Sequence, residues 1–258
     1  MQVFAQAFWV QKAGNDSSEY EDACWPEKLP CGQGASFRFA AADGATETSF
    51  SRIWALQLVR SYCKGQLDRL SSGTGLGDLQ QRWSVIVRKK LACRQSVPWY
   101  AEEKIRMGAF ASILGITLSD DCQRMGGHGE WQAMALGDAC FVQVGCETVL
   151  ARFPLENSAS FNNRPHLLSS DPTYNDKILD HLCTMKGAWR VGDVFFLMTD
   201  ALACWFLREV EEGRFPWRVL RDLDSSAKTK PFSDFVGDLR RRGAIRNDDV
   251  TLLRIELA

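Results

Sequence analysis

The spacing of apolar residues changes along the chain, and this change constrains the fold more than any other feature. Gln2 to Lys12 and Ser36 to Ala42 are rich in aromatic and β-branched residues, which is typical of β-strands. The next apolar residues follow helical spacing instead, at Phe50, Ile53, Trp54, Leu58 and Tyr62. Further strands are then predicted at Ile113 to Leu118, Trp131 to Leu136, Ala139 to Val144 and Val194 to Met198. Strands therefore flank a helical region.

The remaining segments complete this pattern. Helices are predicted at Leu79 to Lys90, Tyr100 to Leu114, Leu202 to Glu211 and residues 232–239. In the last predicted strand, Leu253, Ile255 and Leu257 share one face. Residues 152–188 are polar and irregular, and predict one short helix at Asp176 to Met185. The order strands, helices, strands, helix, strand predicts a single α+β domain over residues 1–258, with antiparallel sheets.

Composition excludes several classes of function. The 258 residues are 45% hydrophobic, enough for a sizeable core. Because the chain has 31 basic and 32 acidic residues, it lacks the basic excess that nucleic-acid binding needs. The longest apolar stretch, Val194 to Leu207, is shorter than the ~20 residues of a membrane span. The nine cysteines lack C-x-x-C spacing, so we expect reduced thiols in a cytoplasmic protein that binds neither nucleic acid nor membrane.

Aspartates stand at the ends of several predicted strands. Asp43, Asp138 and Asp200 each end or interrupt an apolar segment, and Asp248 precedes the last strand. Carboxylates at the strand ends of a packed sheet can converge, and they then repel one another unless a cation lies between them. Mg²⁺ and Mn²⁺ prefer such oxygen ligands. Each aspartate alone is better explained as a turn or cap residue, so only the set indicates a metal site.

The short motifs around these residues resemble those of the protein phosphatase 2C family of metal-dependent Ser/Thr phosphatases. They occur in the family's order over nearly the whole chain: Glu21-Asp22-Ala23, Asp43-Gly44, Gly137-Asp138, Thr199-Asp200 and Asp248-Asp249-Val250-Thr251. The sequence Asp-Gly-Ala-Thr-Glu at the second motif is most similar to the compact bacterial branch. The resemblance implies a four-layer α-β-β-α sandwich of two antiparallel sheets flanked by helices, with a flap-like segment at about residues 152–188.

The resemblance also implies roles for individual residues. Two divalent cations, Mn²⁺ or Mg²⁺, would be held by Asp43, the carbonyl of Gly44, Asp200 and Asp248. Asp43 would bridge both ions, and Glu21 and Asp22 would orient waters bound to them, so these three residues form the predicted catalytic set. Asp138 matches a position that, together with Asp200, can hold a third and weaker ion.

The residues expected to bind substrate depart from the family pattern. Ser17 stands where the family usually has a phosphate-binding arginine, and Ala45 where many members have a histidine. Three arginines are candidates for the missing charge: Arg52, Arg164 and Arg246. Because Arg164 and His166 lie in the irregular segment that would lean over the site, we predict that these two bind the substrate.

Three functions are compatible with these residues. Asp43, Asp200 and Asp248 favour a phosphatase that acts on phosphoserine or phosphothreonine in a phosphoprotein and opposes a cognate Ser/Thr kinase. Ser17 and Glu47 favour a pseudophosphatase that binds phosphoproteins or a partner kinase without turnover. A third candidate is a metal-dependent hydrolase of a small phosphorylated metabolite.

Overall fold

A computed structural model describes residues 1–26, 30–45, 50–73, 75–92, 108–120, 127–162, 164–223 and 230–258. Most of its strands form two antiparallel sheets. The six-stranded sheet contains, in spatial order, β3 (Cys31–Gln33), β1 (Gln2–Val10), β13 (Val250–Leu257), β12 (Val194–Met198), β8 (Cys140–Gly145) and β9 (Thr148–Phe153). The five-stranded sheet contains β11 (Cys183–Arg190), β7 (His128–Leu136), β6 (Ile113–Asp120), β4 (Ser36–Ala42) and β2 (Ala23–Trp25). Strands β5 (Phe110–Ala111) and β10 (Leu168–Ser169) form a separate pair.

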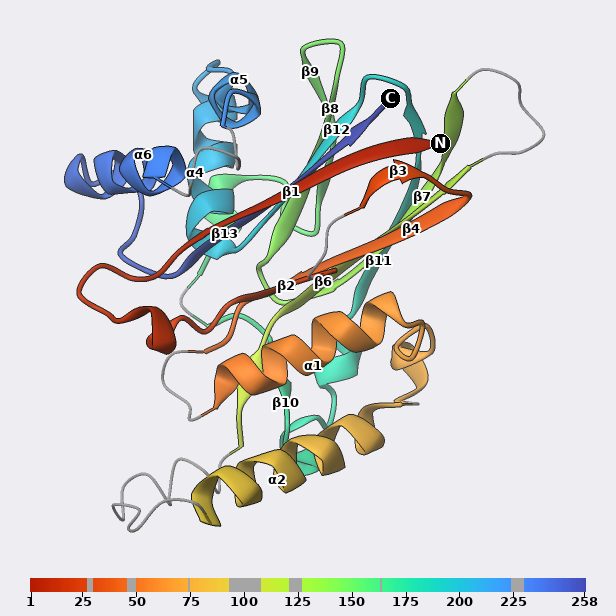
Figure 1. Cartoon of the computed structure of the whole chain (residues 1–258), viewed down its shortest axis with the longest axis vertical. Helices are drawn as coiled ribbons and strands as arrows, with labels where there is room; N and C mark the ends of the chain where they lie inside the picture. The colour runs from red at the N-terminus through yellow and green to blue at the C-terminus, as the bar shows by residue number, and fades with distance from the viewer. Residues whose placement is uncertain are drawn as a thin grey trace.

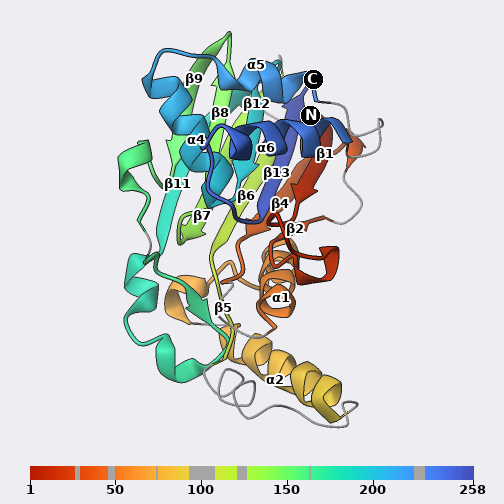
Figure 2. The same cartoon turned by 90° about the vertical axis from the view of Figure 1, so that its left-hand side faces the viewer.

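Helices cover the outer faces of both sheets. The described α-helices are α1 (Ser51–Cys63), α2 (Leu76–Ala92), α4 (Asp200–Glu211), α5 (Pro216–Arg221) and α6 (Lys230–Arg241). Short 3₁₀ helices are η1 (Ser17–Glu19), η2 (Leu70–Ser72), η3 (Ser158–Ser160), η4 (Pro172–Tyr174) and η5 (Ile178–His181). Helices α1 and α2 lie on the side of the five-stranded sheet, and α4, α5 and α6 lie beyond the six-stranded sheet (Figures 1 and 2). The predicted four-layer α-β-β-α sandwich is therefore confirmed.

Each layer boundary buries its own apolar cluster. Between the sheets, Val3 of β1 and Leu253 of β13 belong to a cluster with residues of the five-stranded sheet such as Phe39. The alternate face of the six-stranded sheet packs against α4, α5 and α6. The stripe predicted on α1 faces the five-stranded sheet, where Trp54 and Leu58 are fully buried. The two-residue and helical periods of the sequence thus account for the layers.

Two local predictions are wrong. The helix predicted at Tyr100 to Leu114 is replaced, in its described part, by β5 and the start of β6; residues 100–107 lie outside the described part of the chain. The helix predicted at Asp176 to Met185 is reduced to η5, and β11 begins at Cys183. The strands in these segments, β6 and β11, both pair with β7, and local residue spacing does not encode such pairing. Within the described residues, no helix has the length and apolarity to cross a membrane.

Candidate metal and phosphate site

The strand register brings the predicted site residues to one end of the sandwich. Asp43 follows β4 and Asp22 precedes β2, and these strands pair so that Ala42 lies opposite Ala23. In the other sheet, Met198 at the end of β12 lies opposite both Cys140 at the start of β8 and Leu252 near the start of β13. The antiparallel arrangement therefore places Asp138, Asp200 and Asp248, which flank these strand ends, at one edge.

Asp43 is held in a tight connection after β4. Its N–H donates to the hydroxyl of Ser112 at 3.0 Å, and the N–H of Ser112 donates to the Asp43 carbonyl at 2.8 Å. Gly44 follows at a close approach of two backbone segments, since a Cβ atom there would lie 2.6 Å from the carbonyl oxygen of Glu21. Only glycine fits at this point, and it keeps the Asp43 turn against the Glu21–Asp22 segment.

The Glu21–Asp22 segment is fixed by the start of β13. The N–H of Glu21 donates to Oδ2 of Asp249 at 2.6 Å, and its carboxylate accepts from the Ser51 hydroxyl. Asp22 is 1% exposed, and its Oδ2 accepts from the Thr251 hydroxyl at 2.7 Å. Its Oδ1 is buried and has no hydrogen-bond partner among the described residues. A buried carboxylate oxygen without a hydrogen-bond partner raises the free energy of the folded protein. Oδ1 of Asp22 therefore indicates a site for a cation or a proton.

The carboxylates of this edge lie near enough to perturb one another. Burial raises the pKa of Asp43 well above its ordinary value, and the charges of Asp22, Asp200, Asp138 and Asp248 raise it further. Burial also raises the pKa of Asp138 to about 7, with Asp200 as the next cause. Burial likewise raises the pKa values of Asp22 and Asp200. Groups packed this way hold protons or share a cation.

One cation is supplied by the protein itself. The Arg246 guanidinium forms an ion pair with Oδ2 of Asp200, and the other oxygen of Asp200 accepts from the N–H of Ala201. The Asp200 side chain is 7% exposed and the Arg246 side chain 51%. Asp200 is also the largest cause of the raised pKa of Arg246, and Asp248 and Asp138 add to it. The sequence predicts Arg246 as one of three arginines that could bind the substrate phosphate, but it does not predict the ion pair with Asp200.

The residues fit divalent cations by their chemistry. All of the clustered side chains offer carboxylate oxygens, which Mg²⁺ and Mn²⁺ prefer, and Asp22 has an oxygen without a hydrogen-bond partner in the part of the chain that the structure describes. Among the described residues, no three His, Cys, Asp or Glu side chains are arranged to hold a metal ion as they stand. At Asp200 both oxygens already have protein partners, one in Arg246 and one in the Ala201 N–H. A divalent cation at Oδ2 would therefore compete with the guanidinium for this oxygen.

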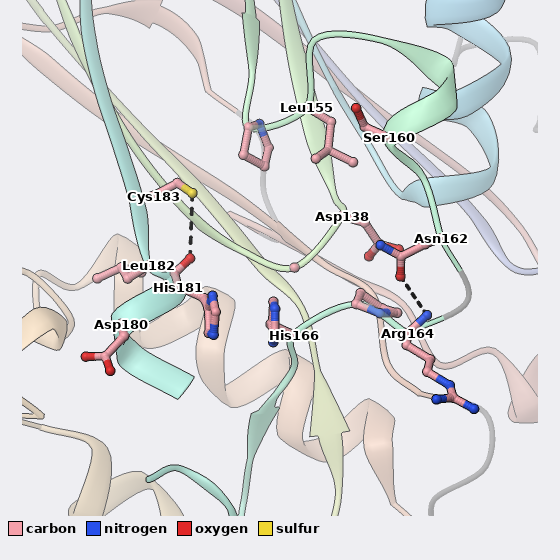
Figure 3. A pocket seen from close by; sticks show the side chains of 13 residues that line it. Asp138, Leu155, Ser160, Asn162, Arg164, His166, Asp180, His181, Leu182 and Cys183 are labelled. Atoms are coloured by element: carbon pink, nitrogen blue, oxygen red, sulfur yellow. Dashed lines mark hydrogen bonds between the residues drawn. The ribbon is translucent and has the colours of Figure 1, made fainter. Parts of the chain in front are cut away.

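A cavity of about 370 Å³ adjoins Asp138 and is walled by the segment predicted to be a flap. Arg164 and His166 both line it, so the structure brings these predicted substrate residues to the same pocket as Asp138. The rings of His166 and His181 stack with centroids 3.6 Å apart, and Figure 3 shows Arg164 directed away from this pair. The stacked partner His181 was not predicted, because only the fold brings η5 to His166.

The other predicted residues lie around the cluster. Ser17 is exposed on η1. Arg52 donates to the carbonyls of Tyr20 and Asp22 at 3.0 and 3.2 Å, and its guanidinium lies 4.8 Å from the Tyr20 ring centroid. It therefore fixes the backbone of the Asp22 segment, in addition to any role toward a ligand. Asp249, for which the sequence predicts no role, accepts hydrogen bonds from the N–H groups of Lys12 and Glu21 and so joins three chain segments.

Comparisons with known proteins address the fold. No family model matches the chain, and no curated protein matches it. Solved structures do match: the serine/threonine phosphatase PstP/Ppp of Mycobacterium tuberculosis, at TM-score 0.58 and 12% identity, covers 100% of this chain and 99% of its own. The PstP catalytic domain with two manganese ions matches at TM-score 0.55 and 11% identity, with 100% and 99% coverage. RsbX in complex with magnesium matches at TM-score 0.53 and 16% identity, with 100% and 96% coverage. The chain therefore has the fold of these phosphatases, as its resemblance to the protein phosphatase 2C family implies.

Proposed function

We propose that the chain is a metal-dependent phosphoprotein phosphatase that hydrolyses phosphoserine and phosphothreonine. The observation that carries this proposal is the convergence of five aspartates from separate strand ends. One of them, buried Asp22, has an oxygen with no hydrogen-bond partner within the described residues. Solved structures with the same fold include one complex with magnesium and one with two manganese ions, which supports divalent cations here. The cytoplasmic location and the cognate kinase stay predictions from the sequence.

In this proposal the residues of the aspartate cluster have different roles. Asp43, whose pKa is raised by four other aspartates, would hold divalent cations together with the carbonyl of Gly44. Asp200 and Asp248 would also be metal ligands, and Asp138 together with Asp200 would hold a third and weaker ion. Glu21 and Asp22 would orient the attacking water. Bound divalent cations would lower the pKa of that water and neutralise phosphoryl oxygens, which is the main need of phosphoryl transfer.

The neighbouring cavity receives the substrate in this proposal. Arg164 and His166 line the cavity together with Asp138, so a phosphate held there would lie next to the carboxylate cluster. A guanidinium matches a phosphate through two parallel hydrogen bonds, which makes Arg164 suited to bind it. The apolar wall formed by Leu155 and Leu182 suits the side chains that flank a phosphorylated residue.

The test is Mn²⁺-dependent hydrolysis of an aryl phosphate and of a phosphothreonine peptide. We expect turnover that stops with a chelator and is abolished in Asp43→Asn, because this carboxylate would touch both ions. Calorimetry with Mn²⁺ should show at least two sites, one of which is weakened in Asp200→Asn. The matched control is Asp234→Asn, an exposed position on α6, which should leave both measurements unchanged. Activity that survives chelation in Asp43→Asn would contradict the mechanism.

The ion pair of Arg246 with Asp200 favours a second candidate, a pseudophosphatase. A guanidinium on a metal-binding carboxylate, together with Ser17 in place of an arginine, would suit a protein that binds phosphoproteins without turnover. This function predicts tighter binding of the phosphothreonine peptide than of its unphosphorylated form, with no phosphate release in a single-turnover experiment. Hydrolysis of the aryl phosphate alone would point instead to a small-metabolite phosphatase.

A further inference from the structure

Arg246 belongs to the loop that connects α6 to β13, two residues before Asp248. Its guanidinium reaches across to Asp200, the first residue of α4, and forms an ion pair with Oδ2. The carboxylate end of this pair is buried, whereas about half of the arginine side chain is exposed. The pair therefore lies at the boundary between the aspartate cluster and solvent.

The positive charge of Arg246 interacts with more than one carboxylate. Asp200 interacts with it most strongly, followed by Asp248 and Asp138, and all three interactions favour the charged guanidinium. Arg246 also counters the effect of burial on Asp138. Without this cation, three carboxylates at the same edge would be left to repel one another. Arg246 is thus an internal counter-ion for the Asp138–Asp200–Asp248 side of the cluster.

A divalent cation needs the same oxygens. Oδ1 of Asp200 accepts from the N–H of Ala201 and Oδ2 accepts from Arg246, so a divalent cation at Oδ2 and the guanidinium, which are both positive, compete for the same oxygen. A cavity of about 250 Å³ lies directly beside Arg246 and is lined also by Phe161, Cys204 and Arg208. The displaced side chain therefore has space on the solvent side of the pair.

We propose that Arg246 competes with a divalent cation for Asp200, so that the metal site on the Asp138 side of the cluster fills last and only when Arg246 leaves. This inference rests on the proposed function in one respect, namely that Asp200 is a metal ligand. It adds a property that this ligand role alone does not contain: the affinity of one site is set by a residue that binds no metal.

The experiment is a Mn²⁺ titration by calorimetry, with thermal unfolding at each metal concentration, of wild type and Arg246→Gln. Removing the competitor should tighten the weakest site about tenfold, within the usual range of coupling between linked binding events. The rise in Tm on adding Mn²⁺ should be larger for Arg246→Gln than for wild type, because the cluster without metal has lost its counter-ion. In Arg246→Gln with Asp138→Asn, the gain in affinity should disappear.

Two further variants make the result specific. Arg164→Gln removes an arginine from the cavity that Asp138 also lines and should leave Mn²⁺ binding unchanged. Arg246→Lys keeps the charge without the planar fork, and should give an affinity between wild type and Arg246→Gln; it also serves if the glutamine variant does not fold.

Each outcome decides the proposal. Unchanged or weaker Mn²⁺ binding in Arg246→Gln overturns it, since Arg246 would then be neutral or would help to hold the ion. Should wild type bind no Mn²⁺ while Arg246→Gln does, the competition stands and the two-metal phosphatase fails for the wild-type chain. Should neither bind, both proposals fall.

Discussion

Arg164 is exposed in the loop that walls the cavity beside Asp138, and its own N–H donates to the side chain of Asn162 at 2.8 Å. This contact fixes the loop backbone and leaves the guanidinium as the part that reaches outward. If the Arg164 guanidinium binds the substrate phosphate, Arg164→Ala should raise KM for a phosphothreonine peptide about tenfold. This factor corresponds to the loss of one hydrogen bond to a charged group. Mn²⁺ binding should not change, because the loss concerns ground-state binding.

The matched control for this variant is Arg69→Ala, which removes an exposed arginine beside η2. It should leave steady-state kinetics unchanged. Equal KM values for wild type and Arg164→Ala would exclude Arg164 as the phosphate residue and direct attention to Arg52, which already lies over Tyr20 beside the Asp22 segment.

Proton uptake by the aspartates gives a pH prediction. The pKa of Asp138 is raised to about 7, and the pKa values of Asp22 and Asp43 are also raised. Without metal the folded protein thus binds more protons than the unfolded chain, so its stability should fall as pH rises from the ordinary carboxyl range to about 7. With Mn²⁺ the trend should weaken or reverse, because the ion binds the deprotonated carboxylates.

The measurement is Tm between pH 5 and pH 8, once with a chelator and once with saturating Mn²⁺. The difference between the two curves should widen as pH rises. Parallel curves would show that the aspartates do not exchange protons for metal. Glu147 is no source of the effect, since Arg218 lowers its pKa and it stays ionised over this range.

Residue positions near strand ends were predictable, and their partners were not. Asp43 and Asp200 follow apolar strands in the sequence, so their placement at a sheet edge follows from strand length and direction. The contacts of Asp249 with Lys12 and Glu21 join residues that lie more than 200 positions apart, and no local pattern encodes them. The same holds for the Arg246–Asp200 pair.

At the scale of elements, the connection after β4 holds Asp43 against the Glu21–Asp22 segment. Gly44 bridges to Ala111 of β5 and leaves no room for a side chain beneath the Glu21 carbonyl. Gly44→Ala should therefore cost about 1–3 kcal/mol of unfolding free energy, the usual range for overpacking. It should also lower Mn²⁺-dependent turnover, because the strain acts on the Asp43 and Glu21 segments together.

Urea unfolding monitored by tryptophan fluorescence checks the stability change. Gly32→Ala is the control, since a Cβ atom at that position in the edge strand β3 meets nothing within 4 Å. It should stay within about 0.5 kcal/mol of wild type, as surface substitutions do. A Gly44→Ala protein as stable as wild type would show that the Glu21 segment can move aside.

Elements with a clear period were predicted, and those without one were missed. The alternation of Leu253, Ile255 and Leu257 gives β13 its face toward the other sheet, as expected. Strand β11 lies at an edge of the five-stranded sheet and is mostly exposed, so its residues Cys183–Arg190 carry no strong two-residue period. An edge strand that buries little has little sequence pattern to predict it from.

At the scale of the whole molecule, the order of strands and helices predicts an α+β domain with antiparallel sheets, whereas the four layers are implied by the resemblance to the protein phosphatase 2C family. The spatial order of the strands does not follow, because β1 lies between β3 and β13 rather than beside β2. That order determines the site, since it places the Glu21–Asp22 segment against the start of β13.

The pairing of β1 with β13 has a consequence for biosynthesis. Val3 lies opposite Leu257 and Val10 opposite Val250, so β1 is translated long before its neighbour β13. At ~5–20 residues per second, the chain between them takes about 10–50 s to translate. During that time the apolar face of β1, with Val3 and Ala5, has no sheet partner from β13. Exposed apolar surface of this kind favours aggregation, and the edge that carries the aspartate cluster is completed only when β13 has been made.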